Sequence, residues 1–212
     1  MKLSHAVVLA AAGAWAVTAQ ADTSEKWAVS AEGGYQMLNN ATDSAKAVFD
    51  GSTGGAVFGG SLRVSLTRSF FAGAGLHVFE KSGGQRVFVD GPGGTVFPLG
   101  HPLEIRVRPI YGFVGYRLRP SSVLVPYLAL GTGSASYRET STVGGVTTTH
   151  SSSKFTWHGA LGLEYAAGRL GIGAEVRYTG IPDVIGLGGV SQIYGENDLG
   201  GLSVIARLSF RR

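Results

Sequence analysis

The sequence predicts an all-β fold, an eight-stranded antiparallel up-and-down barrel that crosses a membrane. Three observations predict it: an export signal at the start, eight stretches of alternating apolar and polar residues, and connections that are alternately short and long. Only 15% of the 212 residues are charged and 34 are glycine, a composition that disfavours disordered chains and long helices. The chain has no cysteine, which excludes disulfide scaffolds, cysteine zinc sites and thiol nucleophiles.

Residues 1–21 are expected to form a cleaved signal peptide, which leaves residues 22–212 as the barrel domain. Lys2 supplies the positive start, the run 6–17 is uncharged and mainly apolar, and Ala19-Gln20-Ala21 is a small-x-small cleavage site. This run is shorter than the roughly 20 residues that a spanning helix needs. No later stretch predicts a spanning helix. The exported chain is therefore soluble in the periplasm, secreted, or a β-barrel.

Alternation with a period of two predicts the strands. The eight stretches are 27–37, 58–66, 70–80, 103–118, 125–138, 154–165, 170–179 and 201–210. In 103–118 the phase changes after Pro109, which predicts a β-bulge because proline cannot donate to the ladder. The stretch 125–138 fits either phase. The favoured phase turns Tyr127, Ala129, Ala135 and Tyr137 outward, because Thr132, Ser134, Ser136 and Arg138 then face inward.

The connections alternate in length along the predicted strands. Those at 67–69, 119–124 and 167–169 are short, whereas those at 39–53, 81–102, 139–153 and 181–198 are long. In an up-and-down barrel all short connections then lie at one rim and all long ones at the other. Short periplasmic turns and long external loops are typical of outer-membrane barrels, so we expect both termini to be periplasmic.

Aromatic residues fall near both ends of the predicted strands. Amphipathic rings favour the headgroup level of a membrane, so two belts are expected on the outward face. The predicted belt residues are Trp27, Phe70, Tyr116, Tyr127, Tyr165 and Phe210 near the short turns, and Tyr35, Phe58, Tyr137, Phe155, Trp157 and Tyr178 near the long loops.

Charged residues occupy the opposite, inward face. Eight strands enclose an interior just wide enough for side chains to fill, and buried charges of opposite sign should pair there. The predicted polar network comprises Glu32, Arg63, His158, Glu164, Glu175, Arg177 and Arg207. His77, Arg106, Arg108 and Arg117 are expected to face the same lumen.

Several segments resemble the small outer-membrane β-barrel proteins related to the OmpA transmembrane domain and the opacity proteins. The segment Pro126-Tyr127-Leu128-Ala129-Leu130-Gly131-Thr132-Gly133 is similar to a strand of that family, and Gly162-Leu163-Glu164-Tyr165 and Ala174-Glu175-Val176-Arg177-Tyr178 resemble its paired strands. The resemblance covers most of 26–210 and implies a β-barrel in a Gram-negative outer membrane. In one departure, Arg211 and Arg212 follow Phe210, where such barrels usually end on the aromatic residue that the assembly machinery reads.

No motif predicts a catalytic, cofactor or metal site. His77 and His158 with Glu164 and Glu175 could imitate a general base and its partner, but a hydrogen-bonded lumen network is the favoured interpretation of them. His150 with 151–153 matches no deacylase motif, and Asp183, Glu196, Asn197 and Asp198 lack the spacing of a calcium loop. The basic residues fall largely on lumen faces, so no nucleic-acid role follows.

The sequence therefore predicts an integral outer-membrane protein with a packed polar lumen and four long external loops, in a structural or surface-interaction role. A narrow, porin-like diffusion pore is the alternative, and a lipid-modifying enzyme is a further one. A soluble ligand-binding barrel would instead have an apolar lumen. The expected partners are outer-membrane lipid, lipopolysaccharide and the barrel-assembly machinery; the sequence does not specify the partner of the loops.

Overall fold

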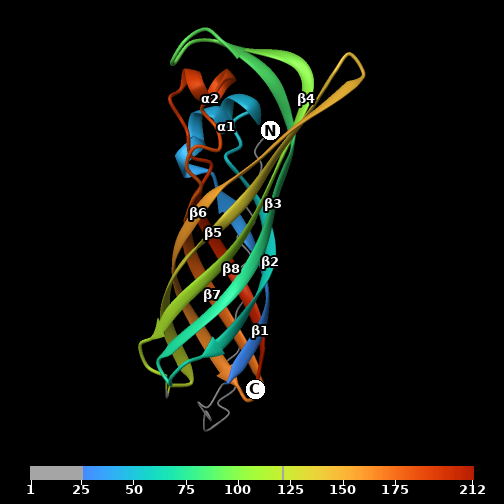
Figure 1. Cartoon of the computed structure of the whole chain (residues 1–212). Helices are drawn as coiled ribbons and strands as arrows, with labels where there is room; N and C mark the ends of the chain where they lie inside the picture. Colours follow the sequence, from blue (N-terminus) through green and yellow to red (C-terminus); the bar gives the residue numbers. More distant parts are fainter. Residues whose placement is uncertain (1–25, 121) are drawn as a thin grey trace, which may run out of the picture.

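Eight antiparallel strands close into one ring in the computed structural model, which describes residues 26–120 and 122–212 (Figure 1). The predicted signal peptide lies outside the described residues. Each strand pairs with its neighbours along the chain, and β1 pairs with β8 to close the ring. The strands are β1 Trp27–Met37, β2 Gly54–Ser65, β3 Phe70–Val89, β4 Val96–Arg117, β5 Leu124–Val143, β6 Val146–Ala167, β7 Leu170–Gly180 and β8 Gly201–Arg211.

Three short helices lie at the end of the ring opposite the tight turns, at the top of Figure 1. A 3-10 turn η1 (Asn39–Ala41) leads into α1 (Thr42–Val48) between β1 and β2, and α2 (Gly189–Ile193) lies between β7 and β8. Among the helices of the described residues, none has the length and apolar character needed to cross a bilayer.

The lower part of the ring carries an outward apolar face and an inward polar one. Leu62, Ile110, Leu161 and Val204 are exposed, for example, whereas their strand neighbours on the opposite face are largely buried. Because lipid solvates the outside and unpaired backbone groups are costly in hydrocarbon, this is the pattern expected of a spanning barrel. Ten of the predicted belt residues lie on the outward face: Trp27, Phe70, Tyr116, Tyr165, Phe210, Tyr35, Phe58, Phe155, Trp157 and Tyr178.

The favoured phase of β5 was wrong. Tyr127 and Tyr137 are buried in the interior, as are Ala129 and Ala135, so the two tyrosines are not part of the belts. Leu128 and Leu130 lie on the outward, exposed face instead. The other phase, which the sequence left open, is the correct one.

The predicted bulge at Pro109 is also absent, because Pro109 pairs with Ala135 in a register that is continuous from Leu103 to Arg117. Leu103, Ile105 and Val107 point inward, so the prediction that Arg106 and Arg108 face the lumen was wrong. The reason is that above the membrane the exterior is water and the interior is an apolar core. The hydropathy of the two faces is therefore exchanged while the backbone continues unchanged.

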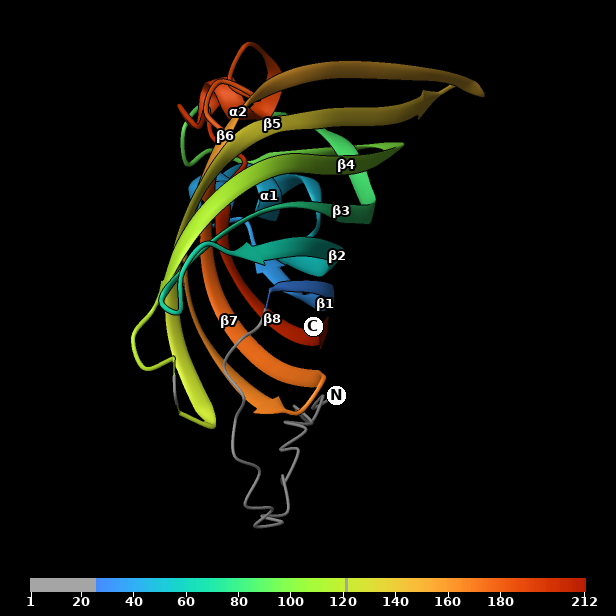
Figure 2. The same ribbon diagram turned by 60° about the horizontal axis from the view of Figure 1, so that its bottom comes forward.

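Two of the four expected long loops are continued strands. β3 and β4 extend to a hairpin between Val89 and Val96, and β5 and β6 extend to Val143 and Val146. Gly144 and Gly145 both have positive φ, +56° and +82°, as a two-residue hairpin turn requires. The extended strands β3 to β6 form a sheet that projects beyond the ring in Figure 2. Only the connections 38–53 and 181–200 remain long, and both carry helices.

Candidate functional site: the charged lumen

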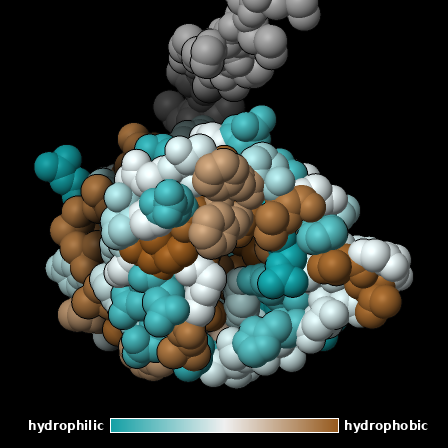
Figure 3. All heavy atoms as spheres, turned by 90° about the horizontal axis from the view of Figure 1, so that it is seen from above, coloured by the Kyte–Doolittle hydropathy of each residue, from teal (hydrophilic) through white to brown (hydrophobic). Residues whose placement is uncertain are grey.

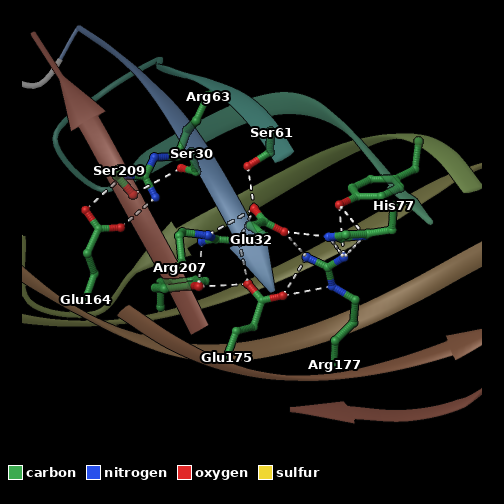
Figure 4. Close-up of polar contacts among 12 residues, drawn as sticks. Ser30, Glu32, Ser61, Arg63, His77, Glu164, Glu175, Arg177, Arg207 and Ser209 are labelled. Carbon is green, nitrogen blue, oxygen red and sulfur yellow. Dashed lines mark hydrogen bonds and ion pairs between the residues drawn. The ribbon is translucent and has the colours of Figure 1, made fainter. Parts of the chain in front are cut away.

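Seven strands contribute charged or histidine side chains to the middle of the ring. All seven residues of the predicted network are buried there, together with His77 and Arg117. Each occupies an inward position of its strand, so the alternation of the backbone alone brings residues far apart in the sequence into one cluster. Figure 4 shows polar side chains of this cluster, with neighbouring serines, converging from the wall of the barrel.

Glu32 on β1 is the centre of the cluster (Figure 4). Its Oε1 accepts hydrogen bonds from Ser61 Oγ at 2.6 Å and from Arg207 Nε at 3.1 Å. Its Oε2 lies 2.7 Å from His77 Nε2 and 3.4 Å from Arg177 Nη2. The carboxylate is therefore fully surrounded by donors, which is what makes a buried charge tolerable.

Glu175 on β7 joins the two arginines from the other side. Arg177 Nε donates to its Oε1 at 2.8 Å, and Arg207 Nη2 donates to its Oε2 at 2.9 Å. Tyr127 donates its hydroxyl proton to the same Oε2 at 2.7 Å and accepts from Arg207 Nη1 at 2.6 Å. Two carboxylates and two guanidinium groups thus alternate in one connected network.

A second ion pair lies nearer the short turns. Arg63 donates from both terminal nitrogens to Glu164, at 3.0 and 3.1 Å, in the two-pronged geometry that strengthens arginine–carboxylate pairs. The guanidinium groups of Arg63 and Arg117 lie 5.3 and 5.0 Å from the centre of the Phe71 ring. The lumen therefore has a central network and a lower ion pair.

The two histidines, His77 and His158, contact the central network and Tyr111. Arg177 Nη1 donates to His77 Nδ1 at 2.7 Å, so Nε2 carries the proton and donates it to Glu32. The His158 ring packs edge-on against Tyr111, with 4.5 Å between centroids. Tyr111 also accepts from Arg177 at 2.9 Å.

Sequence reasoning missed Tyr111 and Tyr127 as parts of the lumen. Glycines on the neighbouring strands could have indicated that these two tyrosines point inward. A Cβ on Gly75 or Gly162 would overlap the ring of Tyr111 or Tyr127 respectively, so each glycine leaves room for one ring. Alternating small and large residues is how small barrels fill their interior.

The side chains of the charged lumen fill it as a plug. The spaces beside His77 and Arg177, and beside Arg63 and Glu164, measure only about 20 Å³ each, room for about one water. The His77–Glu32 pair looks like a general base with its partner, but both groups are enclosed by arginines. No group of three or more histidine, aspartate or glutamate side chains among the described residues is arranged to hold a metal.

The acidic residues of the last long connection organise the loops. Glu196 accepts hydrogen bonds from the backbone N–H groups of Asp43 and Ser44 at 3.0 and 2.9 Å, and so ties this connection to α1. Asp198 accepts from the backbone N–H groups of Ile181 and Gly200 at 2.8 and 2.6 Å. These carboxylates satisfy backbone donors.

Comparison with known proteins supports the same architecture. The family model described as "Outer membrane protein beta-barrel domain" matches residues 7–204. Neisserial surface protein A is 12% identical with a TM-score of 0.56 over 88% of this chain and 96% of its own. A major outer membrane protein from Thermus thermophilus is 11% identical with a TM-score of 0.53 over 88% and 99%. The search of curated proteins gives no match. The chain belongs to the outer membrane protein beta-barrel domain family and is an integral outer-membrane protein.

Proposed function

We propose that the barrel is an anchor and that the projecting sheet of β3 to β6 contacts a partner outside the cell. The observation that carries this proposal is an apolar patch at the tip of the β3–β4 hairpin. Phe88 and Phe97 face each other across the hairpin with 6.2 Å between ring centroids. Their side chains and that of Leu99 are 57%, 48% and 49% exposed.

This patch lies well away from lipid-facing positions. Between it and the upper aromatic belt the outward residues of the sheet are polar, including Glu104, Arg106, Ser136 and Arg138. Contiguous apolar surface beyond a membrane is unfavourable in water and marks an interaction site. A lipid anchor would require such residues next to the belt.

The orientation that we propose places both termini and the short turns in the periplasm. The short turns carry Arg68, Arg119 and Arg169, all exposed, beside the lower aromatic belt. Basic side chains at this level suit anionic lipid headgroups. Arg106, Arg108 and Arg138, above the other belt, suit the phosphates of lipopolysaccharide.

The plugged lumen argues for a role without transport or catalysis. Both a diffusion pore and an enzyme need open space beside their polar groups, and the central network fills that space with paired side chains. We therefore propose neither a pore nor an enzyme. We also propose that the barrel-assembly machinery inserts this protein into the outer membrane, with Arg211 and Arg212 following the terminal aromatic residue Phe210.

The test replaces the two aromatic residues at the tip of the β3–β4 hairpin in the full-length protein, displayed on living cells. The double variant Phe88→Ser with Phe97→Ser should lower adhesion to polystyrene and to immobilised extracellular matrix proteins by about tenfold, since buried aromatic anchors dominate interface energy. The matched control is Val143→Ser with Val146→Ser, which removes exposed apolar side chains from the other hairpin tip and should leave adhesion unchanged.

Surface display is checked on the same cells. The chain has no cysteine, so Ser151→Cys should react with a membrane-impermeant maleimide in intact cells, and Ser69→Cys only in lysed ones. Equal adhesion of both double variants and wild type would overturn the surface role. Labelling of Ser69→Cys in intact cells would overturn the orientation.

A further inference from the structure

The interior above the charged lumen is filled by an apolar cluster, the outer core. Its buried members are Leu38, Ala41, Ala45, Phe49, Val57, Phe79, Leu103, Ile105, Val107, Ala135, Tyr137, Ile181, Val184, Leu199 and Ile205. Figure 3, which looks onto this end, shows apolar side chains gathered near the middle of the face. Strands β3, β4 and β5 contribute to the outer core, whereas β6 contributes no residue of the described chain.

The upper part of β6 is paired on one side only. It pairs with β5 up to Val143↔Val146, but with β7 only as far as Trp157↔Gly180. The side chains of residues 146–151, 153 and 155 are exposed. In Figure 2, β6 is the outermost strand of the projecting sheet. Within the part of the chain that the structure describes, no strand covers its edge from Thr147 to Ser153.

The hairpin turn determines which backbone groups point to this edge. Val143 and Val146 flank a two-residue turn and bond to each other, and in an antiparallel ladder the bonded residues recur at every second position. Even-numbered residues of β6 therefore bond to β5, in agreement with Ala166, whose N–H donates to the carbonyl of Val123 at 3.0 Å. The N–H and C=O groups of the odd-numbered residues from 147 to 153 consequently point to the open edge.

The two edges of the projecting sheet differ in protection. Proteins protect sheet edges with charges, proline, bulges or a covering element. The upper part of β3 carries Lys81 and Arg86, its pairing with β4 is irregular between 81 and 87, and α1 and α2 both contact this strand. From Thr147 to Ser153, β6 contains only threonine, serine and one histidine, and its register with β5 is continuous. The edge of β6 is therefore able to accept another strand.

An open edge of this kind specifies the chemistry of its ligand. Only another extended backbone supplies N–H and C=O groups at the spacing of the ladder. A second copy in the same membrane would be related by a twofold axis along the membrane normal. The upper part of β6 is inclined to the barrel axis (Figure 1), so two copies related in this way would cross instead of lying side by side. A separate peptide segment can follow the inclined edge.

We propose that the edge of β6 from Thr147 to Ser153 binds an extended peptide segment of a partner protein, which adds a strand to the projecting sheet. Backbone hydrogen bonds supply the affinity. The side chains beside the edge are mainly hydroxyl groups, so the segment is uncharged and rich in residues that favour strands. This inference rests on the proposed exposure of the projecting sheet outside the cell, but its site is separate from the apolar tip of the β3–β4 hairpin.

The experiment uses a synthetic strand as the probe. A fluorescein-labelled peptide of alternating threonine and valine, seven residues long, is methylated on alternate amide nitrogens, so that one of its edges can pair and the peptide cannot stack on itself. The mature protein in lipid nanodiscs is titrated with this peptide, and fluorescence anisotropy is measured against empty nanodiscs. Wild type should show saturable binding. The same peptide methylated on every amide nitrogen should show none.

Substitutions in the protein supply the second arm. Ser151→Pro removes an N–H that points to the open edge and should weaken binding about tenfold, whereas Ser151→Ala keeps this N–H and should stay within twofold of wild type. Heat-dependent gel migration shows that each variant is folded, and Thr149→Pro replaces Ser151→Pro if that variant does not fold. Phe88→Ser with Phe97→Ser should bind the peptide as wild type does, so this result is independent of the adhesion test.

Three results would overturn the proposal. The first is absence of saturable binding in wild type, and the second is equal binding by Ser151→Pro and Ser151→Ala. The third is a dimer that sedimentation detects without peptide and that Ser151→Pro abolishes, because the edge would then belong to a second copy of this chain.

Discussion

At the scale of single residues, Glu32 connects the whole central network. Its two oxygens hold Ser61, His77, Arg177 and Arg207, which come from four different strands. Surface ion pairs contribute little because water screens them, whereas breaking a buried pair leaves an uncompensated charge. The same side chain therefore links the strands and sets their register.

Replacing Glu32→Gln should lower the free energy of unfolding by about 3–5 kcal/mol, because Arg177 and Arg207 lose a carboxylate that nothing else replaces. Urea unfolding in lipid vesicles, followed by tryptophan fluorescence, measures the change. The control is Glu104→Gln, which faces water and lies 3.7 Å from Arg106; it should cost less than about 1 kcal/mol. Equal effects of the two substitutions would show that the network does not stabilise the barrel.

At the scale of elements, the sequence predicted strands well where lipid and lumen impose opposite demands on the two faces. The phases of β1, β2, β3, β6, β7 and β8 follow directly from the alternation. The prediction failed above the membrane, where water solvates the outside. There Leu103 and Ile105 turn inward while Arg106 turns outward, and this exchange of hydropathy looked like a bulge.

The extended hairpins were missed for a related reason. The segment 146–154 of β6 is mostly threonine and serine and has water on both sides, so no alternation marks it as a strand. Its backbone is nevertheless paired with β5 through Val143↔Val146. Above Trp157 the other side of β6 has no partner strand among the described residues. Side-chain pattern therefore reveals a strand only where its two faces meet different solvents.

The pairing of β5 with β6 requires a small residue, Gly162, opposite the buried ring of Tyr127. Gly162→Val should destabilise the barrel by at least about 1–3 kcal/mol, since its side chain would overlap the Tyr127 ring. The folded fraction on heat-dependent gels and the urea midpoint measure this effect.

Gly159 on the same strand is the matched control. Its Cβ would point outward, 3.5 Å from Leu130 Cδ2, which is ordinary contact. Gly159→Val should therefore leave stability unchanged or raise it, because valine favours strands. Greater damage from Gly159→Val than from Gly162→Val would mean that the register is wrong.

At the scale of the whole molecule, two closures lie in series. The central network blocks the lumen at membrane level, and the outer core of apolar side chains covers its upper mouth. The outward surface follows the surrounding solvent: apolar between the belts, polar above them, and basic at the short turns. The sequence predicted the polar closure from its charges, but not the apolar one, which requires distant segments to meet.

Because two closures lie in series, we expect the barrel to conduct ions only when both of them are disrupted. Wild-type protein in planar bilayers should give no stepwise conductance, and Glu175→Ser with Arg207→Ser, which removes one charge of each sign, should also stay closed because the outer core remains. Adding Phe79→Ser, which places a small polar side chain in that core at a 1% exposed position, should permit ion steps. Heat-dependent gel migration shows that each variant is folded. Steps in wild type would instead establish the narrow pore, and steps in the double variant would show that the central network alone closes the lumen.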